Sequence, residues 1–394
     1  MARHLLVTND FPPKTGGIQV YLFELWRRLN PGRAVVLSAS SHPDVAGFDA
    51  SSEVETERVA ARTLYFPSRR TYREIEAAIA RHQPDLVLLD PAWPLGLVGP
   101  RLSVPFGVLA HGAEVAIPAR IPLVASSLRY VLRRAAVVIC AGPYPEGEVR
   151  RCVGEGLAPL VRVSPGVDPA RFRPASSEER RATREQLGWA DDDFVVASFS
   201  RLVPRKGMDT LIKASARLAP RWPHLRIVIA GTGRDRTRLE RLVRRHRAPV
   251  SFVGRTSDDL HPRFIAASDL MVMNCRSRWL GLEREGFGIV FLEAAACGIA
   301  QIAGRSGGSH DAVRDGETGI VLERPRRVSD LVDALESLMT NESMRLQMAS
   351  RSREVVQAEG AWDVLTERLA RGLDAFDHAE DEVGLTYGVD EEVQ

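Results

Sequence analysis

The chain alternates short apolar runs with helical stretches, and it does so in two successive series. Continuous runs of Val, Ile and Leu suit strands that are covered on both faces. Strands that alternate with helices form parallel sheets. The first series contains HLLVTN, RAVVLS, PDLVLLD, PFGVLAHG and AAVVICAG, and the second contains FVVASFS, LRIVIAGTG, VSFVG, DLMVMN, IAQIAG and GIVLE. The pattern therefore predicts an α/β protein with two parallel sheets.

The segment between the two series predicts a domain boundary. SPGVDPARFRPASSEER contains several prolines, Gly166 and a polar cluster, which interrupt both periodicities and indicate a hinge near Ser164. Because 394 residues exceed what one core usually accommodates, we expect Rossmann-like domains over 1–164 and 165–359. WDVLTERLARGLDAF, within 360–377, has an apolar helical face that needs a surface to cover. The acidic tail, 378–394, is expected to be disordered.

Bulk properties exclude several classes of protein. The 53 basic and 51 acidic side chains leave a formal charge of +2, which gives no electrostatic reason for a nucleic-acid partner. No CxxC pair is present, so we expect neither a metal knuckle nor a disulfide scaffold, and a reducing compartment fits best. The start of the sequence lacks the pattern of a signal peptide, and no apolar stretch approaches the ~20 residues of a membrane span. We expect a cytoplasmic protein with peripheral membrane contact at most.

The loop TNDFPPKTGGIQVY follows the first predicted strand and enters a helix. Gly16 and Gly17 have no side chains, so backbone N–H groups and the helix N-terminus can approach an anion closely. The spacing matches neither GxGxxG nor a Walker A loop, and an ordinary tight turn explains the glycines equally well.

A second loop, SRLVPRKGMDTLIKA, also lies between a strand and a helix. It places Arg201 and Lys206 at the carboxyl edge of the strand, where ligands bind in open α/β sheets. Two such cations suit a diphosphate leaving group. A solvated basic turn is the alternative, but only three lysines occur in the whole chain, and the use of one here favours function.

The segment EREGFGIVFLEAAACG places Glu285 before a predicted helix and Glu293 inside it. The backbone N–H groups of Phe287, Gly288 and Ile289 then face outward at the helix N-terminus. Glu293 can accept hydrogen bonds from vicinal hydroxyls, such as those of a sugar or a ribose. A glutamate that only complements the helix dipole is the alternative; the apolar surroundings of Glu293 favour a functional partner.

A fourth motif, AHGAEV, ends a strand of the first series. His111 there shares the carboxyl edge with the Gly16 loop and could touch a transferred sugar. Considered alone, a single histidine is more often a satisfied structural residue, and the same holds for Glu114.

These four motifs in this order, followed by GRSGGSHDAV, resemble the retaining glycosyltransferases of family four, which have the GT-B fold: two Rossmann-like domains facing a cleft. The resemblance spans nearly the whole chain. Within the family, VTNDFPPKTGGIQ, SRLVPRKG, EGFGIVFLEA, IAGRSGG and the linker SPGVD are most similar to the actinobacterial PimB-type phosphatidylinositol mannosyltransferases, which use GDP-mannose. The implied function is transfer of mannose from GDP-mannose to a phosphatidylinositol mannoside-type glycolipid at the membrane surface.

The resemblance also implies roles for the domains and residues. The first domain would be the acceptor side, completed by the helix that contains Trp362, and the second would bind the nucleotide sugar. Catalysis would be electrostatic, with front-face attack, retention of configuration and no cofactor or metal. For the donor, the implied contacts are Arg201 and Lys206 with the diphosphate, Gly16 and Gly17 on its other side, and Glu293 with the ribose. Phe252, Val253, Gly254 and Arg255 would lie near the base, and Ile289 would also belong to the donor-binding residues. Glu285 and the Phe287 and Gly288 amides would hold the sugar, and His111 would lie near the anomeric carbon.

The sequence departs from the PimB-type pattern in three segments. After the HG step it reads HGAEVAIPARIP, with Ala113 in place of a second histidine and Ile117 in place of a tryptophan. NCRSRWLGLERE replaces a more glycine-rich stretch, and SGGSHD replaces SGGAPE. Because these segments border sugar and acceptor in the family, a GT-B transferase that uses a UDP-sugar and a soluble or cell-envelope glycan acceptor is the alternative.

Other functions have weaker support. A dehydrogenase lacks its GxGxxG signal with an acid ~20 residues later, and a catalytically dead binding protein would not need Arg201, Lys206 and Glu293. In IPLVASSLRYVLRRAAVV, Arg129, Arg133 and Arg134 have helical spacing. This segment is either an interfacial membrane helix or an ordinary domain helix with a basic edge, and both readings stay open.

Overall fold

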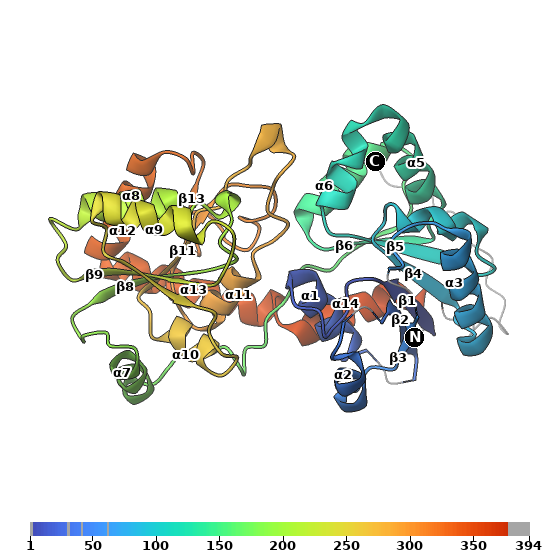
Figure 1. Ribbon diagram of the computed structural model, residues 1–394, viewed down its shortest axis with the longest axis horizontal. Coiled ribbons are helices and arrows are strands. Elements are labelled where there is room, and N and C mark those ends of the chain that lie inside the picture. The colour runs from blue at the N-terminus through green and yellow to red at the C-terminus, as the bar shows by residue number, and fades with distance from the viewer. Residues whose placement is uncertain (1–2, 30–31, 41, 61–62, 377–394) are drawn as a thin grey trace, which may run out of the picture.

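The computed structural model describes residues 3–29, 32–40, 42–60 and 63–376, and the predicted disordered tail lies outside them. Two α/β domains lie side by side (Figure 1). As the repeated strand pattern predicts, each is built on its own parallel sheet, and the described residues form seven strands in one sheet and six in the other.

The first sheet has the order β3-β2-β1-β4-β5-β6-β7. The change of direction between β1 and β4 opens a crevice at the carboxyl ends of the strands, which is where ligands bind in doubly wound sheets. The strands are β1 (His4–Thr8), β2 (Ala34–Ala39), β3 (Thr56–Val59), β4 (Leu86–Asp90), β5 (Phe106–Ala110), β6 (Val137–Cys140) and β7 (Leu160–Arg162).

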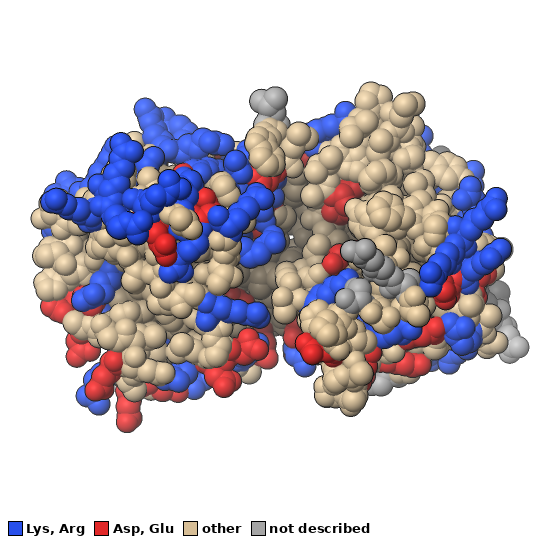
Figure 2. Space-filling view, viewed as in Figure 1, with Lys and Arg blue, Asp and Glu red and all other residues tan. Residues whose placement is uncertain are grey.

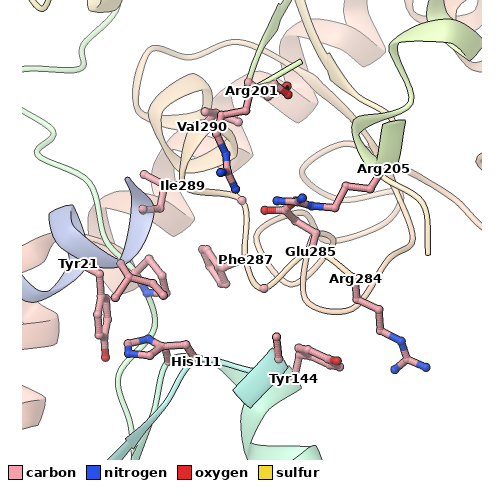
Figure 3. A pocket seen from close by; sticks show the side chains of 18 of the residues that line it. Tyr21, His111, Tyr144, Arg201, Arg205, Arg284, Glu285, Phe287, Ile289 and Val290 are labelled. Carbon is pink, nitrogen blue, oxygen red and sulfur yellow. Dashed lines mark hydrogen bonds and ion pairs between the residues drawn. The ribbon is translucent and has the colours of Figure 1, made fainter. Parts of the chain in front are cut away.

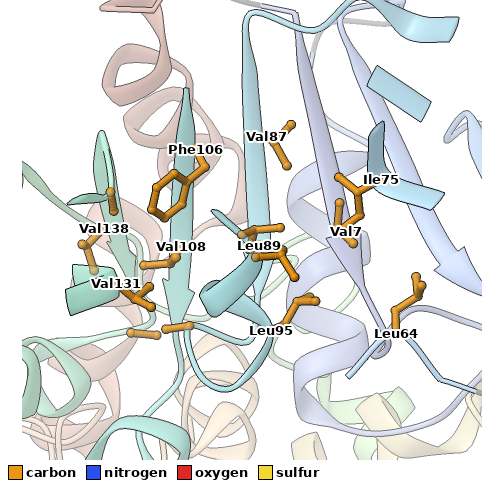
Figure 4. Close-up of a cluster of buried hydrophobic side chains, with 14 of the residues drawn as sticks. Val7, Leu64, Ile75, Val87, Leu89, Leu95, Phe106, Val108, Val131 and Val138 are labelled. Atoms are coloured by element: carbon orange, nitrogen blue, oxygen red, sulfur yellow. The ribbon is translucent and has the colours of Figure 1, made fainter. Parts of the chain in front are cut away.

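Helices cover both faces of this sheet because alternate strand residues point to opposite sides. Val7 and Val108 pack with Ile75 and Val131 on one face (Figure 4), and Leu6 packs with helix residues on the other. The helical elements are α1 (Gly17–Trp26), α2 (Val45–Ser51), α3 (Arg69–His82), η1 (Leu95–Arg101), α4 (Ala113–Ala116), η2 (Pro118–Arg120), α5 (Pro122–Arg134) and α6 (Pro143–Val153).

The second sheet has the order β10-β9-β8-β11-β12-β13 and the same doubly wound arrangement. Its strands are β8 (Phe194–Phe199), β9 (Leu225–Ala230), β10 (Val250–Gly254), β11 (Leu270–Met273), β12 (Gln301–Gly304) and β13 (Ile320–Leu322). Its helical elements are α7 (Ser177–Gln186), η3 (Pro204–Lys206), α8 (Met208–Leu218), α9 (Arg236–His246), α10 (Leu260–Ala266), η4 (Trp279–Gly281), α11 (Ile289–Ala296), α12 (Val328–Thr340) and α13 (Glu342–Glu359).

The last described helix, α14 (Trp362–Asp374), returns to the first domain (Figure 1). Leu365, Leu369 and Leu373 on its apolar face are almost completely buried in the core that also contains α1. The two chain crossings between the domains lie next to each other, since the Val167 amide donates to Gly360 O at 2.9 Å and the Trp362 amide donates to Val167 O at 3.2 Å. The exact domain boundary, at 164, stays a prediction.

Helix α5 is an ordinary domain helix for most of its length. Its apolar residues Leu128 and Val131 are fully buried in the first-domain core, so the helix has no complete apolar face left for a bilayer. Only its beginning protrudes, where the Leu123 side chain is 88% exposed. Within the described residues, no helix is both long and apolar enough to cross a membrane.

Candidate functional site

A cavity of about 500 Å³ lies between the two domains. Figure 2 shows the molecular surface hollowed at this place. The loops that follow β1, β5 and β8 meet the segment before α11 there, so the carboxyl edges of both sheets face one space. Eight of the residues predicted from the sequence line it: Gly17, His111, Arg201, Lys206, Glu285, Phe287, Gly288 and Ile289.

The glycine loop of the first domain faces the beginning of α11 in the second. Gly17 begins α1, and a Cβ atom built on it would lie 3.9 Å from Cδ1 of Ile289. Gly16 precedes it outside the cavity lining, and there a Cβ atom would lie only 2.3 Å from Oε1 of Gln19. That Gln19 side chain donates to Asp10 Oδ1 at 2.7 Å. A larger residue at 16 would therefore disturb the loop that borders the cavity.

Cations of the second domain form one wall of the cavity. Nζ of the buried Lys206 lies 3.0 Å from Oε2 of Glu285, and Nε of Arg205 lies 3.1 Å from the same oxygen. Burial alone would raise the pKa of Glu285, but the charges of Lys206 and Arg205 lower it below its usual value. Glu285 is therefore ionised at neutral pH and holds both cations in place.

Arg201 differs from the other two cations. Its side chain is exposed, lines the cavity and makes no hydrogen bond or ion pair with any residue that the structure describes. Figure 3 shows its guanidinium pointing into the cavity between Val290 and Arg205. Its five N–H donors are available for a phosphate.

The N-terminus of α11 adds backbone amides to the same wall, and no side chain among the described residues caps them. Gly288 is the N-cap residue and has no side chain to satisfy the first amides of the helix. Such amides, with the helix dipole, favour an anion. The segment also touches the first domain, since a Cβ atom on Gly286 would lie 3.3 Å from His111 O. This wall of the cavity thus combines helix amides with the cationic side chains of Arg201, Arg205 and Lys206.

His111 lies on the opposite wall of the cavity, where it is the cation of an ion pair with the buried Asp90. Its Nε2 lies 2.6 Å from Oδ1 of Asp90, whose Oδ2 accepts a hydrogen bond of 2.6 Å from Thr8 Oγ1. Burial alone would lower the pKa of His111, but the Asp90 charge and hydrogen bond raise it to about 9. The Tyr21 ring meets the imidazole edge to face, with centroids 5.6 Å apart. His111 is therefore an imidazolium at neutral pH.

Glu114 also has a local partner that fixes the loop after β5. Its Oε1 accepts from the backbone amide of His111 and, at 3.0 Å, from that of Gly112. Gly112 has φ +132°, a backbone conformation that residues other than glycine rarely adopt. The carboxylate thus positions the turn that presents His111.

Several predicted residues lie outside the cavity lining. Glu293 is partly buried, and its Oε2 lies 2.9 Å from Nε2 of His261. The predicted base segment comprises Phe252, Val253, Gly254 and Arg255 in and after β10. Phe252 is covered by Arg236 at 4.5 Å from the ring centroid, and Val253 is 44% exposed. Contacts of these residues with ribose and base stay predictions.

Three residues of the site were missed by sequence reasoning. Asp90 ends the strand run PDLVLLD at the same carboxyl edge as His111. An acidic residue at that end of a strand could have indicated a partner for the histidine. Arg205 is adjacent to Lys206, but arginine is so frequent in this chain that one more arginine gave no signal. Tyr144, at the start of α6, lines the cavity without any motif to mark it.

Two of the three segments that depart from the resemblance border the cavity. Ala113 and Ala116 of the HGAEVAIPARIP segment line it, together with Leu282 and Arg284 of NCRSRWLGLERE. Figure 3 shows Arg284 and Tyr144 at one end and Tyr21 at the other. The cavity therefore extends beyond the cation cluster toward the sequence segments in which this chain is distinctive.

Comparisons with known proteins identify the family of this chain. The family model described as Glycosyltransferase Family 4 matches residues 15–171, and the model described as Glycosyl transferases group 1 matches residues 179–355. The GDP-mannose-dependent monoacylated alpha-(1-6)-phosphatidylinositol monomannoside mannosyltransferase of Corynebacterium glutamicum is 35% identical over 374 residues, covering 94% of this chain and 97% of its own. The GDP-mannose-dependent alpha-(1-6)-phosphatidylinositol monomannoside mannosyltransferase of Mycobacterium tuberculosis H37Rv is 37% identical, covering 95% and 100%.

Solved structures share the fold at low sequence identity. Anabaena Alr3699/HepE in complex with UDP aligns with a TM-score of 0.80 at 21% identity, covering 95% of this chain and all of that one. WaaG, a glycosyltransferase involved in lipopolysaccharide biosynthesis, aligns with a TM-score of 0.68 at 18% identity, covering 93% and 98%. The arrangement of two parallel-sheet domains around a cleft is therefore the predicted one.

Proposed function

We propose, on the basis that this chain belongs to the family 4 glycosyltransferases with the GT-B fold, that it transfers mannose from GDP-mannose to a phosphatidylinositol mannoside. The observation that supports this most directly is the 35–37% identity to two such mannosyltransferases over nearly the full length of both chains. The cavity between the domains supplies the chemistry that a nucleotide-sugar donor requires.

The donor diphosphate would lie between the second-domain cations and the N-terminus of α11. Arg201 would hold it with donors that no described residue uses, and Lys206 would reach it from its pair with Glu285. The Gly16 and Gly17 loop would close the other side. Fixed cations in a partly enclosed space stabilise the charge that develops on a leaving phosphate.

The transferred sugar would lie between the α11 amides and His111. As the bond from the anomeric carbon to the phosphate oxygen breaks, the acceptor oxygen would form its bond on the same face. The hydroxyl proton would pass to the leaving diphosphate, because the imidazolium of His111, with a pKa raised to about 9, has no free lone pair at neutral pH. His111 would then act by donating a hydrogen bond and by its charge.

The reaction would need no metal ion. Charge neutralisation of the diphosphate, which a metal provides in other enzymes, would come here from Arg201 and Lys206 together with helix amides. Transfer in the presence of a chelator should therefore equal transfer without it.

Membrane contact would be peripheral, at the inner face of the plasma membrane. Ile121 and Leu123 at the start of α5 are 49% and 88% exposed, and Trp279 in η4 is 62% exposed. In Figure 1 the β11–α11 segment and the start of α5 both lie at the upper edge, on either side of the boundary between the domains. Apolar tips of this kind can enter the interfacial layer of a bilayer.

A donor panel followed by an acceptor incubation tests the proposed function. We expect GDP and GDP-mannose to raise Tm more than UDP and UDP-glucose do. The stabilising donor, incubated with vesicles containing phosphatidylinositol mannoside, should then add one hexose to the lipid, as measured by mass spectrometry. Stabilisation by UDP-sugars and transfer to a soluble glycan would favour the alternative donor and acceptor instead.

A further inference from the structure

A cluster of arginines surrounds one buried carboxylate at the end of the cavity away from Tyr21. Glu148 of α6 has a side chain only 7% exposed and is paired with Arg151, one turn along the same helix. Nη2 of Arg120 lies 3.7 Å away, and Nη1 of Arg284 lies 3.5 Å away from the second domain. Three positive charges thus surround one negative charge, and this excess favours a further anion.

Arg284 is the member of this cluster that faces the cavity. Its Nε is enclosed and has no hydrogen-bond partner among the described residues, and its contact with Glu148 is long for a hydrogen bond. The guanidinium lies over the Tyr144 ring, 5.9 Å from its centroid. The enclosed Nε cannot reach a ligand, but most of the Nη donors have no partner among the described residues, and a planar guanidinium of this kind suits a phosphate.

The cavity rim beside these arginines is apolar. Leu282 lines the cavity and is 47% exposed, and Ala116 lines it from the first domain. Ile117, the next residue along, is 38% exposed. A ligand at this end meets positive charge and apolar surface together, and this combination complements the negative headgroup and the first acyl carbons of an anionic lipid.

We propose that Arg120, Arg151 and Arg284 bind the phosphate of the glycolipid acceptor. The sugar headgroup would then extend along the cavity toward His111, while the acyl chains would leave over Leu282 and Ile117. Because the phosphate site needs Arg284 from one domain and Arg120 from the other, a correct acceptor would also hold the domains together. This inference rests on the proposed function and names the acceptor contact within it.

The test uses Arg120→Gln and Arg284→Gln, with Arg150→Gln as the matched control. Arg150 lies next to Arg151 on α6, is 61% exposed and has its own partner, Glu146, at 2.9 Å. At saturating GDP-mannose, with phosphatidylinositol mannoside in vesicles, each test variant should raise the acceptor KM by roughly tenfold or more, as expected for losing a charge-assisted contact to phosphate. Its kcat and the Tm shift caused by GDP should stay within twofold of wild type, and the control should match wild type throughout.

Two outcomes would overturn the inference. If the acceptor KM is unchanged while kcat and the GDP-induced Tm shift fall, the cluster is only an ion-pair contact between domains. If the control raises KM as much as the test variants do, the effect is general surface charge.

A binding measurement separates this inference from the proposed function. Vesicles with phosphatidylinositol mannoside should bind wild type at least about fivefold more tightly than vesicles of equal net charge with a phosphate-free mannolipid, and Arg284→Gln should abolish that difference. Binding with this dependence but without transfer would retain the phosphate site and reject the proposed reaction. Transfer without this dependence would retain the reaction and reject the site.

Discussion

His111 Nε2 lies 2.6 Å from Asp90 Oδ1 at the carboxyl edge of the first sheet, where Asp90 is buried and the His111 side chain is only 9% exposed. Their pairing makes the imidazole a fixed cation facing the cavity, so its contribution differs from that of a general base. An imidazole with a pKa near 7 could exchange a proton with the acceptor, whereas this one keeps its proton across the physiological pH range.

Asp90→Asn should lower the pKa of His111 from about 9 toward or below its ordinary value of 6.5. Because the folded-state pKa is raised, the pair contributes its full stability below pH 6.5 and loses it as pH rises through 9. We expect the variant to be less stable by about 3 kcal/mol below pH 6.5, with the difference shrinking above pH 9. Thermal unfolding across this range, with imidazole titration by NMR, measures both effects, and a stability difference independent of pH would contradict the pairing.

Arg201→Ala should reduce kcat by roughly 100-fold, by analogy with the loss of an oxyanion donor. Since Arg201 is exposed and has no partner among the described residues, the folded protein should keep its Tm within about 1 °C. Lys206→Ala should cause a similar loss of rate, together with lost stability because Glu285 loses a partner. Steady-state kinetics on folded variants test this; near-normal turnover in Arg201→Ala would remove the leaving-group role.

Glu285→Gln should destabilise the second domain, because Lys206 and Arg205 would remain beside each other without their shared carboxylate. We expect a loss of about 3 kcal/mol at pH 7. The folded-state pKa of Glu285 is lowered, so its stabilising effect is present above the ordinary value of 4.5 and falls as pH drops through the lowered value. Urea unfolding at pH 7 and at pH 3 should show the wild-type advantage shrinking in acid, and an equal gap at both would contradict the ion pair.

Leu369→Ala in α14 should destabilise the first domain by about 2 to 5 kcal/mol, because Leu369 is fully buried against first-domain core residues. Arg368→Ala, at the neighbouring exposed position, is the matched control. Denaturant unfolding measures the difference, and equal stability of the two variants would show that α14 does not complete the first domain.

Sequence reasoning predicted the fold and named most of the second-domain residues that line the cavity, because both depend on local patterns. Alternating apolar runs specify parallel strands, and Arg201, Lys206 and Glu285 lie in short motifs next to strand ends. Asp90 and Tyr144 were missed for a different reason. Their roles depend on neighbours distant in sequence, His111 and Arg284, which only the folded chain brings together.

The reading of α5 as an interfacial helix illustrates the same limit. Arginines and apolar residues at helical spacing describe a membrane-surface helix and a domain helix equally well. Tertiary packing decides between them here, since Leu128 and Val131 are fully buried in the core. The membrane-facing candidates are instead single exposed side chains, such as Leu123 and Trp279, which periodicity does not identify.

The affinity of GDP, measured by titration calorimetry, tests most directly the claim that the cavity between the domains holds the donor diphosphate. Wild type should bind GDP, and Arg201→Ala should bind it at least about tenfold more weakly, as expected for one lost charge-assisted contact. Arg221→Ala, an exposed arginine paired with Glu336 outside the cavity, should bind as wild type does. Equal GDP affinity in wild type and Arg201→Ala would place the diphosphate elsewhere and contradict the account.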